Sequence, residues 1–271
     1  MPMPIGVFDS GLGGLSVLKA LKAAMPDQAF VYFGDNANAP YGIREPGDIL
    51  AKTRAALDIL WRDCDLVILA CNTASAIALR PIQTAGVPVG KSVLGVFVPM
   101  IEALAERPWG DTSPPSRVSL DRVALFATPA TVASGAFERE LNLRAQGIQV
   151  TAQACPELVD AIESGDRARS ARLVHQYATA LKETLPEPQA AVLGCTHYPW
   201  VASDFQSALG AEVRLISQPD LIAASLKDYL IRHQIPGDTG TDRFLTTGNC
   251  HAVSRQASQF WGSNLPFENA L

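Results

Sequence analysis

Short apolar runs alternate with segments of helical periodicity along almost the whole chain. Six runs have the length and the apolar character of buried strands, at residues 5–8, 30–33, 66–69, 123–126, 192–193 and 244–245. Between them, apolar side chains recur every three or four positions, as in residues 50–61 and 222–230, which is typical of one buried helix face. Regular alternation of strand and helix predicts parallel sheets covered by helices, an α/β fold.

The periodicity is interrupted once, at residues 107–121, where prolines, serines and a glycine separate two α/β stretches. A chain of 271 residues can form one large domain or two of ordinary size. The interruption favours two, and we interpret this segment as the neighbourhood of a crossing between them.

Two segments can be laid over each other, DLVILACNTAS at residues 65–75 and QAAVLGCTHYP at residues 189–199. Each contains a buried strand, a small residue, a cysteine and residues that can cap a helix. Ligands of open α/β sheets bind beyond the carboxyl ends of the strands, so Cys71 and Cys195 are expected at such edges. With Asn72, Thr73 and Thr196 as helix caps, the nearby backbone N–H groups should make each thiol lose its proton more easily.

Composition narrows the possible functions. With 48% hydrophobic and 18% charged residues the protein is globular, and its net charge of −5 without a basic run argues against nucleic acid or an anionic membrane surface as partner. The chain shows neither a secretory leader nor an apolar stretch long enough to cross a bilayer, so we expect a cytoplasmic protein.

The five cysteines are odd in number and form no CxxC pair, which argues against a disulfide framework and against structural zinc. We expect free thiols, and packing roles for the three cysteines without a strand-edge context, Cys64, Cys155 and Cys250. No metal is expected, because the single Cys-x-His spacing lacks companion ligands.

The two matched cysteines allow more than one chemistry. A nucleophile with a histidine base would explain Cys195 and His197 but would leave Cys71 without a role. Two thiols facing each other across a small molecule fit the repeat better, since one can remove a proton from a carbon while the other returns one from the opposite side.

A glycine-rich turn at residues 9–16 suggests a dinucleotide site, with Asp35 in the position of a ribose-binding acid. The pattern is broken, because Ser16 replaces the third glycine and Asp9 would bring a carboxylate beside the pyrophosphate. The same glycines would instead let backbone N–H groups approach a different ligand, with the hydroxyl of Ser10 as a further donor.

Seven motifs together resemble the glutamate racemases, a cofactor-independent group of the aspartate/glutamate racemase superfamily. They are FDSGLGG (8–14), FGDNANAPYG (33–42), LACNTASA (69–76), TPATVASGAF (128–137), CPELVDAIESG (155–165), LGCTHYP (193–199) and FLTTGN (244–249). The resemblance implies interconversion of L- and D-glutamate for peptidoglycan synthesis, without a cofactor and usually as a homodimer. It also implies two similar α/β domains facing each other across a cleft, about 1–97 plus 214–271 and about 98–213.

The resemblance assigns roles by position. Cys71 and Cys195 match the two acid/base residues, Asp9 and His197 match residues that assist the cysteine on their own side, and Glu163 matches a further assisting glutamate. The residues that match the substrate pocket are Asp9, Ser10, Tyr41, Gly42, Asn72, Thr73, Thr196 and His197. Plainer interpretations also stand: Asp9 as a helix cap, His197 as a structural histidine and Glu163 as a solvated carboxylate at a helix end.

The expected reaction removes a proton from a carbon beside a carboxylate, so the site must stabilise additional negative charge. Because the motifs contain no lysine or arginine, we expect the backbone N–H groups after Ser10, Cys71 and Cys195 to hold the substrate carboxylates. Two sulfurs on opposite faces of one carbon would lie roughly 7 Å apart. The alternatives are an aspartate racemase or related isomerase, an NAD-dependent oxidoreductase and a solute-binding protein without catalysis.

Overall fold

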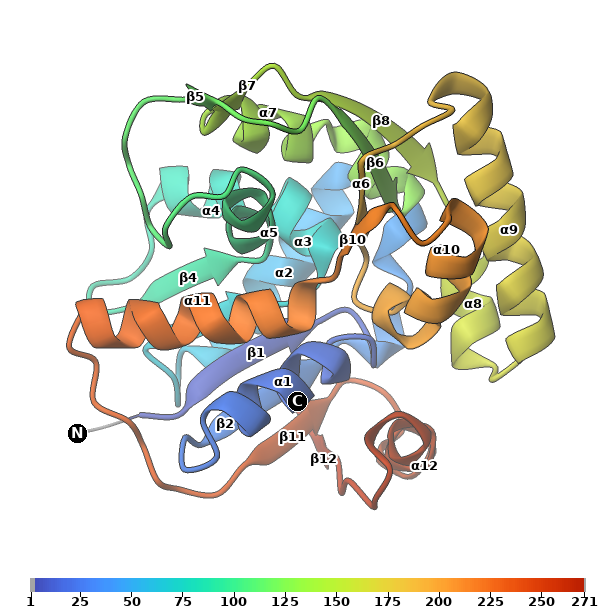
Figure 1. The fold of residues 1–271 in the computed structure, drawn as a ribbon. Helices are drawn as coiled ribbons and strands as arrows, with labels where there is room; N and C mark the ends of the chain where they lie inside the picture. Colours follow the sequence, from blue (N-terminus) through green and yellow to red (C-terminus); the bar gives the residue numbers. More distant parts are fainter. Residues whose placement is uncertain (1–2, 271) are drawn as a thin grey trace.

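The computed structural model describes residues 3–270 and consists of two parallel sheets with helices packed on them (Figure 1). The first sheet has the strand order β12-β11-β2-β1-β3-β4 and the second the order β10-β9-β6-β8. The strands of the first sheet are β1 (Ile5–Asp9), β2 (Phe30–Gly34), β3 (Leu66–Leu69), β4 (Ser92–Gly95), β11 (Arg243–Thr246) and β12 (Glu268–Asn269). Those of the second are β6 (Arg122–Ala127), β8 (Gln149–Ala154), β9 (Ala190–Gly194) and β10 (Arg214–Ile216). A short pair, β5 (Ser116–Arg117) and β7 (Ala145–Gln146), lies apart from both sheets.

The two sheets share one strand order. Four strands of the first sheet run β2-β1-β3-β4, and the whole second sheet repeats this order as β8-β6-β9-β10. All pairings within both sheets are parallel. The predicted fold class, two similar parallel α/β units, is therefore confirmed.

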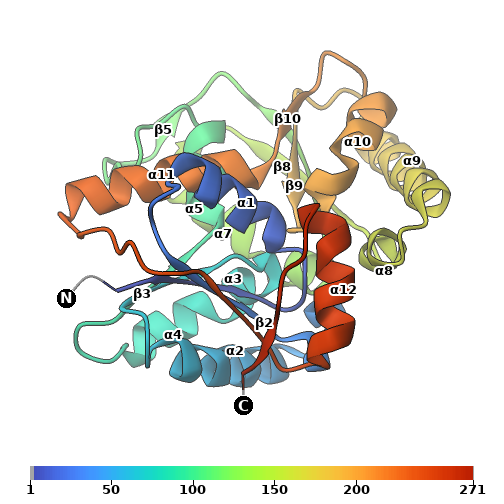
Figure 2. The same cartoon turned by 90° about the horizontal axis from the view of Figure 1, so that it is seen from below.

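The helices cover the sheets on both faces. Figure 2 shows α1, α5 and α11 on one face of the first sheet and α2 and α4 on the other, and Figure 1 shows α8, α9 and α10 outside the second. The helix bounds are α1 (Leu15–Ala24), α2 (Pro46–Leu60), α3 (Asn72–Ile77), α4 (Leu79–Ala85), α5 (Phe97–Leu104), α6 (Pro129–Ser134), α7 (Ala136–Asn142), α8 (Leu158–Glu163), α9 (Arg167–Thr184), α10 (Ala202–Leu209), α11 (Gln218–Arg232) and α12 (Cys250–Trp261), with 3-10 turns η1 (Asn36–Asn38), η2 (Tyr41–Ile43) and η3 (Tyr198–Val201). Within residues 3–270, no helix combines the length and the apolar character needed to cross a bilayer.

One apolar core reaches both sheets. It contains Val7 and Tyr32 of the first sheet together with Val123 and Leu125 of the second, all buried and packed with helices α1, α5 and α11. Burial of shared apolar surface holds the two units in a fixed relation. The loops at the carboxyl ends of both sheets can therefore form one site.

All six strands predicted from apolar runs are present, whereas β4, β5, β7, β8, β10 and β12 were not predicted. Strand β8 reads QVTAQA and is an edge strand, so it lacks the continuous apolar run of a central parallel strand. The domain division at residues 97/98 and 213/214 stays a prediction. Pairing of β10 with β9 favours a return to the first unit after Ile216.

Candidate active site

The strand order places a crevice at equivalent positions in the two units. From β1 the chain moves to β2 on one side and then to β3 on the other, so the order reverses between β1 and β3; the same reversal occurs between β6 and β9. Ligands of open α/β sheets bind at this switch point, outside the carboxyl ends of the strands. Ser10 follows β1 and Cys71 lies just beyond β3, while Thr128 follows β6 and Cys195 follows β9.

A cavity of about 70 Å³ lies where the two crevices meet, and it is lined by both Cys71 and Cys195. Nine residues of the expected site line it: Ser10, Tyr41, Gly42, Cys71, Asn72, Thr73, Cys195, Thr196 and His197. Asp9 and Glu163 lie behind this lining, where each contacts a residue of the cavity wall. Residues from distant parts of the chain are thus brought together around one small space.

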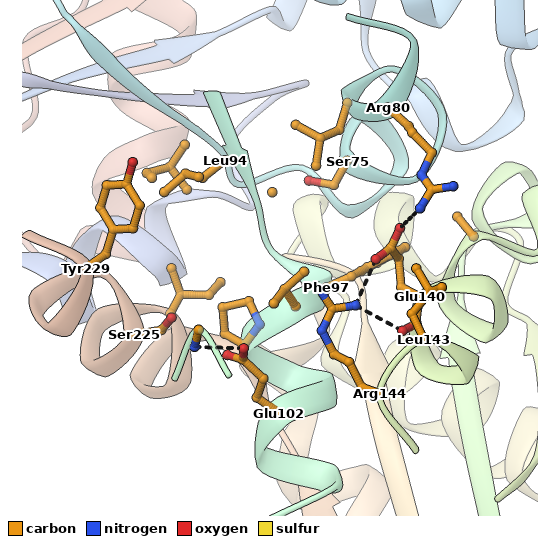
Figure 3. A pocket seen from close by; sticks show the side chains of 18 of the residues that line it. Ser75, Arg80, Leu94, Phe97, Glu102, Glu140, Leu143, Arg144, Ser225 and Tyr229 are labelled. Carbon is orange, nitrogen blue, oxygen red and sulfur yellow. Dashed lines mark hydrogen bonds and ion pairs between the residues drawn. The ribbon is translucent and has the colours of Figure 1, made fainter. Parts of the chain in front are cut away.

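A larger cavity, of about 440 Å³, lies elsewhere, between α4, α5, α7 and α11. Figure 3 shows Arg80 and Arg144 directed at the carboxylate of Glu140, with nitrogen to oxygen distances of 3.1 and 2.9 Å. Ser75, on the helix that begins beside Cys71, forms part of its wall. Neither switch-point cysteine lines this cavity, so the smaller one is the candidate active site.

The surroundings of Cys71 favour the protonated thiol. Its Sγ lies 3.4 Å from the hydroxyl oxygen of Ser10, and the N–H of Ala74 in the first turn of α3 is directed at the sulfur. Burial, followed by the negative charge of Asp9, raises the pKa of this thiol to about 12. The expectation that a helix N-terminus would make this thiol lose its proton is therefore wrong, because desolvation outweighs the helix.

The expected helix caps are also wrong. Helix α3 begins after Cys71 without a side-chain cap, and Thr196 is followed by a turn and by η3 instead of a regular helix. The hydroxyl of Thr73 lies 2.9 Å from that of Thr128. Among the described residues, neither side-chain polar atom of the buried Asn72 has a hydrogen-bond partner. A buried amide without a partner that lines a cavity is suited to bind a ligand.

Cys195 is the start of a chain of polar contacts. Its Sγ lies 3.9 Å from Nδ1 of His197, and Nε2 of the same ring lies 2.7 Å from Oε1 of Glu163. Burial alone would lower the pKa of His197, but hydrogen bonds to Cys195 and Glu163 and their charges raise it well above its ordinary value. Burial would raise the pKa of Glu163, but the hydrogen bond and charge of His197 lower it. Glu163 is thus an ion-pair partner of His197, and its interpretation as a solvated carboxylate is wrong.

Asp9 connects the two sides of the site. Its carboxylate is fully buried, accepts the N–H of Gly11 at 3.0 Å and accepts the hydroxyl of Thr196 at 3.2 Å. Burial raises its pKa, although the positive charge of His197 and these hydrogen bonds oppose the shift. The N-cap of α1 is Gly14, so the interpretation of Asp9 as a simple helix cap is wrong.

The glycine-rich turn approaches protein instead of a ligand. A Cβ atom on Gly13 would lie 2.3 Å from Oγ1 of Thr196 and 2.4 Å from Nδ1 of His197. The Cys195 loop therefore occupies the space that a pyrophosphate on this turn would need. Asp35, the expected ribose acid, instead accepts the hydroxyl of Tyr41 at 2.6 Å and that of Thr247 at 2.6 Å. This geometry removes the basis of the dinucleotide alternative.

Several residues at or behind the cavity wall were not expected from the sequence, and three of them carry hydroxyl or thiol groups. Thr128 and Cys155 line it, and the buried Thr131 lies behind Thr128 with its hydroxyl 2.9 Å away. Cys155 directly follows β8, so it lies at the end of a strand, contrary to the interpretation from the sequence. Its burial raises the pKa of its thiol. The two threonines of TPAT (128–131) could have been predicted as site residues, because polar residues at the end of a buried strand face the crevice.

Comparison with known proteins agrees with this geometry. A family model described as Asp/Glu/Hydantoin racemase matches residues 7–226. A glutamate racemase of Ruegeria pomeroyi is 57% identical over 269 residues, covering 99% of this chain and 100% of its own length. The crystal structure of a Bacillus anthracis glutamate racemase superposes with a TM-score of 0.86 at 27% identity, covering 98% of this chain and 97% of the other. A Francisella tularensis glutamate racemase solved in complex with D-glutamate gives a TM-score of 0.83 at 27% identity, covering 98% of this chain and 95% of the other.

Proposed function

The chain belongs to the Asp/Glu/Hydantoin racemase family and is an amino-acid racemase, and we propose that it interconverts L- and D-glutamate by passing a proton through Cys71 and Cys195. The observation that carries the mechanism is the position of the two sulfurs. Each cysteine follows the switch point of its own sheet, and both line one small cavity. A substrate carbon between them would meet one sulfur on each face.

Glutamate is the substrate that the relatives support best. Proteins named glutamate racemase match the chain over nearly its full length, and one neighbour was solved with D-glutamate. In the proposed complex the carboxylates meet the amide of Asn72, the hydroxyls of Thr73 and Thr128 and the first N–H groups of α3, which have no acceptor within their helix. Among the described lining residues there is no lysine or arginine, so neutral donors, together with the protonated His197, would stabilise the increase in negative charge.

The two cysteines begin the reaction in opposite protonation states. The raised pKa of Cys71 favours its thiol form, so Cys195, whose Sγ lies 3.9 Å from Nδ1 of His197, is the sulfur that we assign as the base in the first direction. The Cys195 thiolate takes the α-proton of one enantiomer and becomes a thiol. The Cys71 thiol then gives its proton to the opposite face of the carbon and becomes a thiolate, which completes the inversion.

The reverse direction needs the Cys71 thiolate, and Asp9 is suited to assist it. Its raised pKa allows this carboxyl group to hold a proton close to the sulfur. Glu163 assists the other side by keeping His197 protonated and fixed in orientation. We therefore assign Asp9 to the Cys71 side and the pair of His197 and Glu163 to the Cys195 side.

The cellular setting follows from the same resemblance. We propose that the enzyme works in the cytoplasm without a cofactor, as a homodimer, and supplies D-glutamate for peptidoglycan synthesis. The support is the similarity to glutamate racemases over 99% of the chain. Analytical ultracentrifugation tests the dimer, and restored growth of a D-glutamate auxotroph tests the role in the cell.

The mechanism is tested by exchange of the α-proton in D₂O. The purified enzyme, incubated with L-glutamate and separately with L-aspartate, should exchange and invert glutamate faster than aspartate. Cys71→Ala and Cys195→Ala should each abolish inversion, while Cys64→Ala, which removes a buried thiol that does not line the cavity, should keep it. Substantial inversion by either active-site variant refutes the two-cysteine mechanism. Faster turnover of aspartate identifies a sister activity, and binding without exchange identifies a solute-binding protein.

A further inference from the structure

The turn between β1 and α1 is joined to the loop of the opposite unit that carries Cys195. Ser16, in the first turn of α1, has its Oγ 2.8 Å from the main-chain carbonyl oxygen of Thr196. Both residues are buried. We infer that Ser16 is a positioning residue, whose hydroxyl holds the backbone beside Cys195 so that this sulfur stays opposite Cys71. The inference rests on the proposed function of the two cysteines.

The hydroxyl of Ser16 has one proton and two acceptors within reach, the carbonyls of Gly13 and Thr196, each at 2.8 Å. The carbonyl of Gly13 also accepts the N–H of Ser16 at 3.0 Å. Among the described residues, no other group donates to the carbonyl of Thr196. Removal of the hydroxyl therefore leaves this buried carbonyl without a partner, and the loop must move to find one.

Other contacts also join the turn to the opposite unit. Asp9 accepts the side-chain hydroxyl of Thr196 at 3.2 Å, and the N–H of Leu12 donates to Glu163. Those contacts involve side chains, whereas the bond from Ser16 reaches the main chain one residue after Cys195. Loss of that bond should therefore shift Cys195 itself. The bond also explains why Ser16 stands where a dinucleotide-binding turn would have its third glycine, because its hydroxyl donates to the opposite unit.

The test compares Ser16→Ala with Ser170→Ala. Ser170 is a matched control, because it is also a buried helical serine, but its hydroxyl donates within its own helix, to the carbonyl of Asp166 at 2.9 Å. We expect Ser16→Ala to lower kcat about 10- to 100-fold with KM changed less than about 3-fold, since a displacement of about 1 Å at a reacting group costs up to about 100-fold. Ser170→Ala should keep the wild-type kcat and KM.

Kinetic isotope effects separate positioning from a general loss of folding. If proton transfer at Cys195 becomes the slowest step, the kinetic isotope effect of α-deuterium should rise for the glutamate enantiomer whose α-proton Cys195 removes. It should fall for the other enantiomer. A merely structural role would reduce the amount of active enzyme and leave both isotope effects at their wild-type values. Ser16→Thr keeps the donor and should keep the wild-type isotope effects, which provides a second readout if Ser16→Ala folds poorly.

Two outcomes overturn the inference while the proposed function stands. One is a Ser16→Ala enzyme with wild-type kcat, and the other is a lowered kcat with both isotope effects at their wild-type values. Wild-type protein that fails to invert glutamate would instead refute the proposed function. The two failures are distinguishable, because only the second appears in the unmodified protein.

Discussion

Gly13→Ala should damage the active site by steric overlap alone. The new Cβ atom would lie 2.3 Å from Oγ1 of Thr196, and 2.4 and 2.5 Å from Nδ1 and Cε1 of the His197 ring. Non-bonded atoms prefer separations of about 3.5 to 4 Å, so the two loops must move apart by about 1 Å. Because the ring is 4% exposed and is held by Glu163 at 2.7 Å, the movement cannot be absorbed by rotation into solvent.

The size of the effect follows from this displacement. Overpacking of a buried site costs about 1 to 3 kcal/mol of unfolding free energy. A shift of about 1 Å near the reacting sulfur should lower kcat by about 100-fold, while KM changes less. Gly13 does not have a positive φ angle, so these effects would come from the contact and not from a strained φ angle.

Urea denaturation and a circular dichroism assay of glutamate inversion measure both quantities. Gly47→Ala is the matched control, because a Cβ atom there meets nothing within 4 Å in the first turn of α2. It should be neutral or stabilise the protein by up to about 1 kcal/mol. A Gly13→Ala enzyme with wild-type stability and kcat within about 3-fold of wild type would show that the turn and the Cys195 loop are not in rigid contact.

Glu163→Gln should bring the pKa of His197 down towards its ordinary 6.5, so the alkaline limb of the kcat profile should move to lower pH, and an unchanged limb would contradict the pairing. The pair also stabilises the fold. The stability that His197 contributes is complete below pH 6.5 and is lost as the pH rises through its raised folded pKa. The stability that Glu163 contributes is complete above pH 4.5 and is lost as the pH falls through its lowered folded pKa. The difference in urea stability between wild type and Glu163→Gln should therefore be largest between pH 4.5 and 6.5. Asp35→Asn should weaken the bonds to Tyr41 and Thr247 and raise KM for glutamate more than it lowers kcat, whereas an unchanged KM would show that Tyr41 does not need this anchor.

Local patterns in the sequence determined the fold class and the position of both cysteines. Buried parallel strands are continuous apolar runs, so β1, β2, β3, β6, β9 and β11 could be predicted from neighbouring residues alone. A cysteine directly after such a run must lie at the carboxyl edge of a sheet. Edge strand β8, with its mixed sequence, gave no such signal, and Cys155 was therefore assigned a packing role.

The tertiary structure alone decided what surrounds those cysteines. The bond of Ser16 to Thr196 joins residues 180 positions apart, and the loop that carries Thr196 can pack against the turn only because Gly13 has no Cβ atom. The raised pKa of Cys71 arises from burial by many residues, whereas a motif shows only the helix that follows the thiol. Desolvation and steric contact depend on every neighbour in space, and for that reason they were settled by the packing of the two units and not by any local run of residues.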